Sequence, residues 1–221
     1  GILKQIHCEP NSGKKDSVLF WRNADHDNGA DIMIQVVKAL APEYREIRFI
    51  FAVRPGSQYQ EDLINLEKQY DNVIVHIYPY TGGVTLASLL NDALFVISPY
   101  RCLSINPQIS ILETLMAGVP VIASNVESNS EVVQNGLTGL IVDNNVDAFV
   151  KSTRHLLSNR AYLEKLAGNA KGETARKYNW SLFNEQLLGI YNSMAVCATW
   201  QVRDGRSSTS GNQGINPEND M

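Results

Sequence analysis

Short apolar runs that alternate with helix-like segments constrain the fold of this chain more than any other feature. Each run is continuously apolar, whereas a strand with one side in water would alternate apolar and polar residues. Continuous runs are typical of strands buried on both faces, as in a parallel sheet. The sequence therefore predicts strands at residues 17–21, 47–53, 73–77, 93–98, 119–123 and 140–142.

The segments between these runs carry apolar residues at helical spacing. In residues 29–41, Met33, Val36, Val37 and Leu40 recur at positions i, i+3, i+4 and i+7, which places them on one helix face. Further helices are predicted at residues 57–70, 84–93, 109–117, 146–158 and 181–194. This alternation predicts an α/β fold with a Rossmann-like, doubly wound parallel sheet, which binds ligands at the carboxyl ends of its strands.

Composition excludes some classes of partner. The 221 residues carry a net charge of -4, so the chain lacks the Lys/Arg excess with which proteins usually meet a nucleic acid backbone. The three cysteines show neither metal-binding nor disulfide spacing, which favours a cytoplasmic location. Asp25, His26 and Asp27 are adjacent in a loop and rarely would converge on one ion, so no metal site is predicted. No apolar run approaches the ~20 residues that span a bilayer, so no transmembrane segment is expected.

Three regions are expected along the chain. Residues 1–16 read as the remnant of a linker, residues 17–200 as one domain that includes a closing helix at 181–194, and residues 201–221 as a disordered tail. Within the tail, residues 204–221 hold only Ile215 and Met221 as large apolar groups, too few to offset the entropy of ordering. Because the chain starts at Gly1 rather than Met, we expect a fragment or one domain of a longer protein.

One carboxylate stands out in the apolar stretch from Ile111 to Asn125. Glu113 lies about one turn inside the helix predicted at 109–117, whose N-terminus near Gln108 points its free N–H groups toward the ligand edge of the sheet. A helix N-terminus of this kind suits a phosphate. Glu113 would then reach a neutral, hydroxyl-rich part of the same ligand, such as a ribose. A surface position on an amphipathic helix is the alternative.

Several segments, taken in order, resemble the C-terminal domain of retaining GT-B glycosyltransferases of the group 1, or family 4-like, type. The similarity is carried by "SPY", "ILETLMAGVPVIASN" and "SEVVQNGLTGLIVDNN", with "VLFWRNADHDNGADIMIQVVKAL" and "LASLLNDALFVISPY" before them and "ARKYNWSLFNEQLLGIY" after them. It covers roughly residues 17–193 and identifies the chain as one half of a GT-B fold, in a divergent form.

The resemblance implies a nucleotide-sugar site. Glu113 matches the Glu that binds the ribose hydroxyls, and Gly29 matches the Gly of a Lys-Gly loop. Arg22 corresponds to the Arg that neutralises the diphosphate, although the spacing is one residue too long and an ungapped fit places Asn23 there. The remaining matches are the phosphate segment Pro107, Gln108 and Ile109 and the base-stacking loop of Tyr78 and Pro79.

The chain also departs from the family pattern. Asn28 replaces the Lys of Lys-Gly, and Ile105 replaces a first Glu that contacts the donor sugar. A missing Lys removes charge from the stabilisation of a leaving diphosphate, and a missing Glu removes an acceptor for a sugar hydroxyl.

The expected function is that of a retaining glycosyltransferase in polysaccharide biosynthesis. The chain would bind a UDP- or GDP-linked hexose with no cofactor, and a saccharide or lipid-linked acceptor would be held by a missing N-terminal domain. The location would be cytoplasmic, at the inner face of the membrane if the missing domain is peripherally attached. A non-catalytic GT-B-like partner module of a glycosyltransferase complex is the main alternative, and a sugar-nucleotide epimerase is a weaker one.

Overall fold

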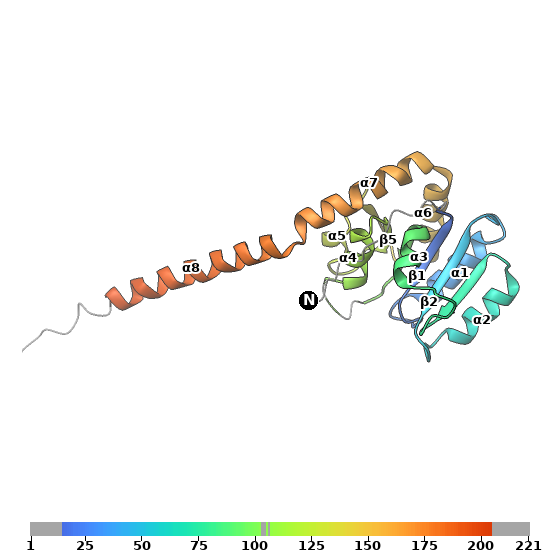
Figure 1. Ribbon diagram of the computed structural model, residues 1–221, viewed down its shortest axis with the longest axis horizontal. Helices are drawn as coiled ribbons and strands as arrows, with labels where there is room; N and C mark the ends of the chain where they lie inside the picture. Colours follow the sequence, from blue (N-terminus) through green and yellow to red (C-terminus); the bar gives the residue numbers. More distant parts are fainter. Residues whose placement is uncertain (1–14, 103–104, 106, 205–221) are drawn as a thin grey trace, which may run out of the picture. The chain divides into compact units, whose positions relative to one another are not determined.

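The structure is a computed structural model in which residues 15–102, 105 and 107–204 are described, with side chains described up to Met194. The chain divides into two compact units, residues 1–176 and residues 177–221. The first unit holds the sheet and its helices (Figure 1). The predicted domain boundaries at residues 16/17 and 200/201 stay predictions.

The first unit contains a parallel sheet of six strands, as the apolar runs predict. The strands are β1 (Ser17–Trp21), β2 (Arg48–Val53), β3 (Val73–Ile77), β4 (Ala93–Ser98), β5 (Val121–Ser124) and β6 (Gly139–Val142). Their order is β3-β2-β1-β4-β5-β6, and the Rossmann-like fold is confirmed. Because the winding reverses between β1 and β4, a fold of this kind is expected to bind ligands in a crevice between the loops that leave these two strands, at the carboxyl edge of the sheet.

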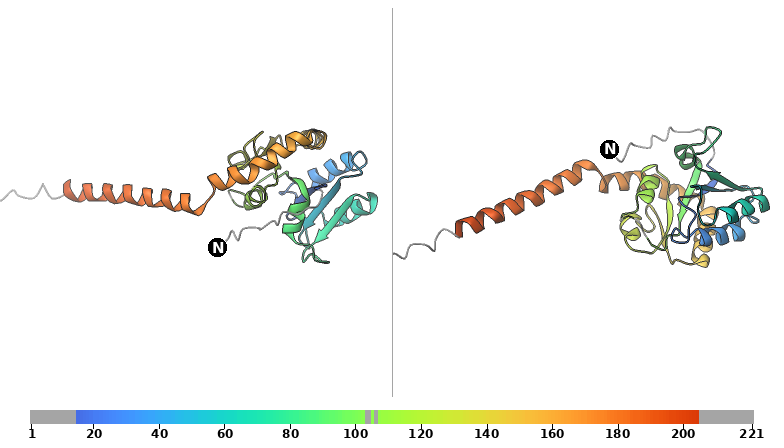
Figure 2. Two further views of the ribbon diagram at one scale, coloured as in Figure 1. Left: turned by 45° about the horizontal axis from the view of Figure 1, so that its top comes forward. Right: turned by 90° about the horizontal axis from the view of Figure 1, so that it is seen from below.

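Seven helices of the described residues connect or follow the strands up to Lys177, and an eighth lies in the second unit. They are α1 (Ala30–Leu40), α2 (Gln60–Gln69), α3 (Leu86–Asp92), α4 (Ile109–Met116), α5 (Asn129–Val132), α6 (Val146–Ser158), α7 (Arg160–Lys177) and α8 (Trp180–Asp204). Helix α1 packs against both α2 and α6 (Figure 2). Helices α5 and α7 were not predicted from the sequence.

The core is built from the apolar runs and the inner faces of the helices. Fully buried phenylalanines lie along the strands and on α6, and the rings of Phe20 and Phe51 are 5.8 Å apart on neighbouring strands. Along α1, the predicted face of Met33, Val36 and Leu40 is buried. Burial of both sheet faces explains why the strands read as continuous apolar runs.

Helix α8 differs from the helices of the first unit because most of its described large apolar side chains are exposed, Leu182 being partly buried. Asn179 caps its start, since Asn179 Oδ1 accepts from the backbone N–H of Leu182 at 2.8 Å. The helix begins one residue before the predicted position and continues to Asp204, past residue 200, where the domain was predicted to end. The rest of the predicted tail lies outside the described residues. In the part of the chain that is described, no helix is long and apolar enough to cross a bilayer.

A close backbone approach joins the loops after β1 and β4. Gly29 has φ 72°, and a Cβ atom built on it would lie 1.9 Å from the carbonyl oxygen of Pro99. In addition, the backbone N–H of Arg101 donates to the carbonyl of Asp27 at 2.8 Å. Only glycine combines this backbone conformation with this contact, so Gly29 sets the width of the crevice between β1 and β4.

We predict that Gly29→Ala lowers the free energy of unfolding by about 3 kcal/mol or more, because the methyl group adds overpacking to the cost of a left-handed backbone. Gly56→Ala is the matched control, since Gly56 has φ 75° and nothing within 4 Å of the added Cβ. It should cost only about 1 kcal/mol. Urea unfolding of both variants measures the difference, and equal losses would show that the Gly29–Pro99 contact is not limiting.

Candidate functional site

Arg22 supplies a cation at the carboxyl end of β1. Its Nη2 donates to Gln108 Oε1 at 3.4 Å, and its guanidinium carbon lies 5.7 Å from the centroid of the Trp21 ring. The competing position, Asn23, instead uses its backbone carbonyl to accept from Asn28 Nδ2 at 3.0 Å. Of these two positions, Arg22 is therefore the one whose side chain reaches the N-cap residue of α4.

Glu113 lies on α4, one turn after the first residue of the helix. Its side chain is partly buried, and this burial raises the pKa of the carboxyl group above its ordinary value of 4.5, while the positive charge of Arg22 acts in the opposite direction. Arg22 therefore acts on Glu113 only through its charge, while its hydrogen bond goes to Gln108 at the start of the same helix.

The N-terminus of α4 lies beside this pair. Gln108 is the N-cap residue, is only 2% exposed, and makes no side-chain capping bond. Its carbonyl accepts from the backbone N–H groups of Ile111 and Leu112 at 3.1 and 3.3 Å. The first N–H groups of a helix have no acceptor within the helix, and in α4 these include the N–H groups of Ile109 and Ser110. An anionic ligand suits this position.

Three residues that sequence reasoning missed, Trp21, Tyr100 and Thr114, support the site together with Ser110 at the start of α4. Trp21 Nε1 donates to Thr114 Oγ1 at 3.1 Å, and Thr114 Oγ1 donates to the carbonyl of Ser110 at 2.7 Å. The side chains of Ser110 and Tyr100 are hydrogen-bonded at 2.9 Å. Burial raises the pKa of Tyr100, with the bonds to Ser110 and Arg22 opposing it, so the hydroxyl group stays neutral. A tryptophan directly before the strand-end Arg22 was the only signal in the sequence.

Two other polar groups near the crevice are already engaged. Asn28, which replaces the family's Lys, directs its amide to the carbonyl of Asn23 within its own loop. Arg101 forms two short bonds with Asp31, at 2.6 and 2.7 Å, and donates to the carbonyl of His26. These bonds lower the pKa of Asp31 and raise that of Arg101. The charge of Arg101 is therefore balanced within the protein.

The remaining predicted site residues lie farther from the pair or on its rim. Tyr78 and Pro79 follow β3, which is separated from β1 by β2, and the Tyr78 ring is 59% exposed with an edge contact to Tyr80 at 5.7 Å. Pro107 and Ile105 are exposed in the loop before α4. The structure thus gathers Arg22, Gln108 and the α4 N-terminus, and leaves Tyr78 and Pro79 apart.

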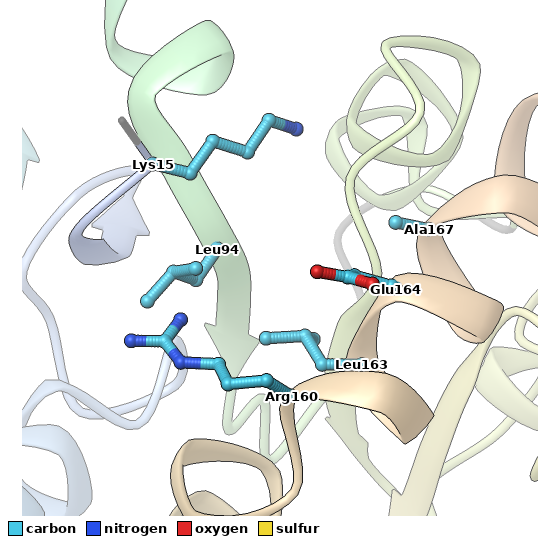
Figure 3. Close-up of a pocket in the computed structure, with 6 residues that line it drawn as sticks. All are labelled: Lys15, Leu94, Arg160, Leu163, Glu164 and Ala167. Atoms are coloured by element: carbon cyan, nitrogen blue, oxygen red, sulfur yellow. The ribbon is translucent and has the colours of Figure 1, made fainter. Parts of the chain in front are cut away.

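A separate hollow of about 510 Å³ lies at the opposite, amino edge of the sheet. Figure 3 shows Arg160, Leu163, Glu164 and Ala167 on α7 across from Lys15 and Leu94. Lys15 precedes β1 and Leu94 is near the start of β4, so the hollow is distinct from the crevice. Among the described residues, no group of three or more His, Cys, Asp or Glu side chains is placed to share a metal ion.

Comparison with known proteins identifies the family of this domain. The family model of the glycosyl transferases group 1 matches residues 15–159. The alpha-D-kanosaminyltransferase of Streptomyces kanamyceticus is 25% identical over 184 residues, covering 81% of this chain and 46% of that protein. The chain spans about half the length of the curated relatives it matches.

Solved structures share the fold. TarM superposes with a TM-score of 0.71 at 17% identity, covering 85% of this chain and 37% of TarM. A TarM variant from S. aureus was solved with UDP, fondaparinux and alpha-GlcNAc-glycerol. The C-terminal domain of a glycosyl transferase group 1 protein from Francisella tularensis superposes with a TM-score of 0.61 at 14% identity, covering 74% of this chain and 86% of that domain.

We predict that Glu113→Gln is more stable than the wild type at neutral pH and equal to it near pH 3. Burial raises the folded-state pKa of Glu113, so the folded chain holds the proton more tightly than the unfolded chain. Wild-type stability therefore falls as the pH rises from the ordinary value of 4.5 through the raised folded-state pKa. Glutamine has no such proton.

Urea unfolding between pH 3 and pH 7 measures this difference. Glu164→Gln, which removes the same charge from an exposed site on α7, is the matched control and should show a smaller change with pH. If the difference in free energy of unfolding between Glu113→Gln and the wild type does not grow with pH, burial does not destabilise the charged form of Glu113.

Proposed function

The chain belongs to the glycosyl transferases group 1 family, and we propose that it is the donor-binding domain of a retaining glycosyltransferase. The reaction is transfer of a hexosyl group from a UDP- or GDP-linked sugar to a saccharide or lipid-linked acceptor. The observation that carries this proposal is the hydrogen bond from Arg22, at the end of β1, to Gln108, the N-cap residue of the helix α4 that carries Glu113.

Arg22, the N-terminus of α4 and Glu113 each suit one part of a nucleoside diphosphate. The free N–H groups at the start of α4 bind phosphate oxygens, because the helix end is a ready donor site with a positive partial charge. Arg22 offsets the charge that develops on the diphosphate as it leaves the sugar. The carboxylate of Glu113 accepts hydrogen bonds from ribose hydroxyls one helical turn away. Gly29 lets the loop after β1 meet the Pro99 carbonyl of the loop after β4.

The acceptor is assigned to a part of the protein beyond this chain. The chain spans about half the length of its curated relatives, and it superposes on a structure that is itself a C-terminal domain. The proposed donor site is at the carboxyl edge of the sheet. A second domain that packs against this edge would supply the acceptor side of the site. In that arrangement the acceptor attacks from the face that the diphosphate leaves, and orientation supplies much of the rate.

The nucleotide is proposed from this geometry and from the bound UDP of the TarM complex. On the sugar side, Ile105 is 51% exposed in the loop before α4, where the family resemblance implies a carboxylate. An apolar side chain there cannot accept a hydrogen bond from a sugar hydroxyl. The chain would therefore hold its donor mainly through the diphosphate and the ribose.

A second candidate is a non-catalytic partner module of a glycosyltransferase complex. This candidate is favoured because polar side chains around the crevice already form hydrogen bonds within the protein. Asn28 bonds within its own loop and Arg101 is balanced by Asp31, which leaves Arg22 as the cation facing α4. Weaker leaving-group stabilisation would suit a domain that binds nucleotide without turning it over.

We predict that UDP or GDP binds this chain and that Glu113→Ala weakens the preferred nucleotide about 5- to 150-fold, the equivalent of about 1–3 kcal/mol for a lost polar contact. Calorimetric titration measures both affinities. Glu164→Ala, at the opposite edge of the sheet, is the control and should bind as the wild type does. Absence of binding by any nucleotide up to millimolar concentration would contradict the donor-site assignment.

We also predict that the chain alone transfers no sugar, because its site lacks the acceptor side. The measurement is product formation from the preferred nucleotide-sugar with a panel of saccharide acceptors. Steady transfer to a defined acceptor by this chain alone would show that the proposed division between two domains is wrong.

A further inference from the structure

We propose that Trp21 is a positioning residue that fixes the spacing between Arg22 and Glu113, so that the crevice recognises ribose and diphosphate as one unit. This inference rests on the proposed nucleotide-sugar function. Trp21 would then contribute to the preference for nucleotides with a ribose over their deoxy analogues without touching the ribose itself.

The Trp21 side chain contacts both halves of the site with different parts of its ring system. Its face lies against the guanidinium of Arg22, whose central carbon is 5.7 Å from the ring centroid. Its edge N–H donates to Thr114 Oγ1 at 3.1 Å. Thr114 directly follows Glu113 on α4, so one rigid indole links the cation to the helix that carries the carboxylate.

The α4 end of this link is firmly held. Thr114 is fully buried, and its hydroxyl group both accepts from Trp21 and donates to the Ser110 carbonyl at 2.7 Å. The Ser110 side chain bonds to the buried Tyr100 hydroxyl group at 2.9 Å. Helix α4 is thereby tied to β1 on one side and to the β4–α4 loop on the other. Its first turns have little freedom to slide along the crevice.

This rigidity matters because a nucleoside diphosphate has a fixed spacing between its ribose and its phosphates. If α4 shifts relative to β1, Arg22 and Glu113 cannot both meet their parts of the ligand. A misplacement on the order of 1 Å can cost about 100-fold in a process that depends on orientation. Loss of the Trp21–Thr114 bond should therefore weaken the ribose contact most, because the diphosphate is also held by Arg22 at the end of β1, whereas the ribose is held by Glu113 on α4 alone.

The test uses substitutions that remove the bond from either side. Trp21→Phe keeps a ring face for Arg22 and removes the N–H donor, and Thr114→Val removes the hydroxyl group at nearly constant volume. Thr114→Ser restores a hydroxyl group as the conservative rescue. The measured quantity is the ratio of dissociation constants for the 2′,3′-dideoxy and ribo forms of UDP and of GDP. Circular dichroism and the melting temperature of each variant report folding.

We expect the wild type to prefer the ribo form by about tenfold, the size of one polar contact. Trp21→Phe and Thr114→Val should each reduce this preference to about threefold or less, and the double variant should go no further, because both act on one bond. Thr114→Ser should retain the wild-type ratio. In a Glu113→Gln background, Trp21→Phe should leave the ratio unchanged.

The outcomes separate this inference from the proposed function. Binding by the wild type with an unchanged ratio in folded Trp21→Phe and Thr114→Val would overturn the positioning role alone. No nucleotide binding by the folded wild type would overturn the proposed function and this inference with it. A further test needs no ligand. The indole N–H of Trp21 should exchange slowly with solvent, and Thr114→Val should make this exchange faster. An exchange rate that Thr114→Val leaves unchanged would also overturn the inference.

Discussion

The approach of the Gly29 backbone to the Pro99 carbonyl is the constraint on which the site depends. A parallel sheet whose winding reverses between β1 and β4 leaves a crevice at the carboxyl ends of those strands. Contact between the two loops fixes its width, since a Cβ at Gly29 would lie 1.9 Å from the Pro99 oxygen. The residues that follow β1 and β4 are then held in place by the order of the strands in the sheet.

The charges around the crevice are distributed unequally. Arg101 and Asp31 satisfy each other and hold the β1–α1 and β4–α4 regions together, which is a structural use of charge. Glu113 forms no such ion pair with any of the described residues, and burial raises the pKa of its carboxyl group, with the charge of Arg22 acting in the opposite direction. A carboxylate kept in an unfavourable site is typical of functional positions. The unfavourable burial of Glu113 is consistent with a ligand whose hydroxyl groups take the place of water.

The sheet was predictable from the sequence because burial on both faces removes polar residues from the strands. The predicted and observed bounds differ by at most two residues at any strand end, as at β5, which begins at Val121 rather than residue 119. Helix α7 was missed because its inner face is narrow. Leu163, Leu166, Ala170 and Thr174 form a thin buried line, and Gly168 and Gly172 weaken the helical signal.

The site was predictable only in part. Glu113 and the α4 N-terminus followed from local pattern, because a strand, a loop and a helix in sequence define a ligand edge. The Trp21–Thr114 bond joins residues 93 positions apart, and no local pattern encodes such a contact. The choice between Arg22 and Asn23 likewise required the fold, because side-chain direction at a strand end changes with each residue.

We propose that a nucleoside diphosphate binds in the crevice between β1 and β4. The most direct measurement is a map of backbone amide NMR shifts as the preferred nucleotide is added to the chain. We expect the largest shifts at Gly29, Ile109 and Ser110, with the Trp21 indole signal moving in parallel. Shifts centred instead on Lys15, Arg160 and Glu164, at the opposite edge of the sheet, would contradict it.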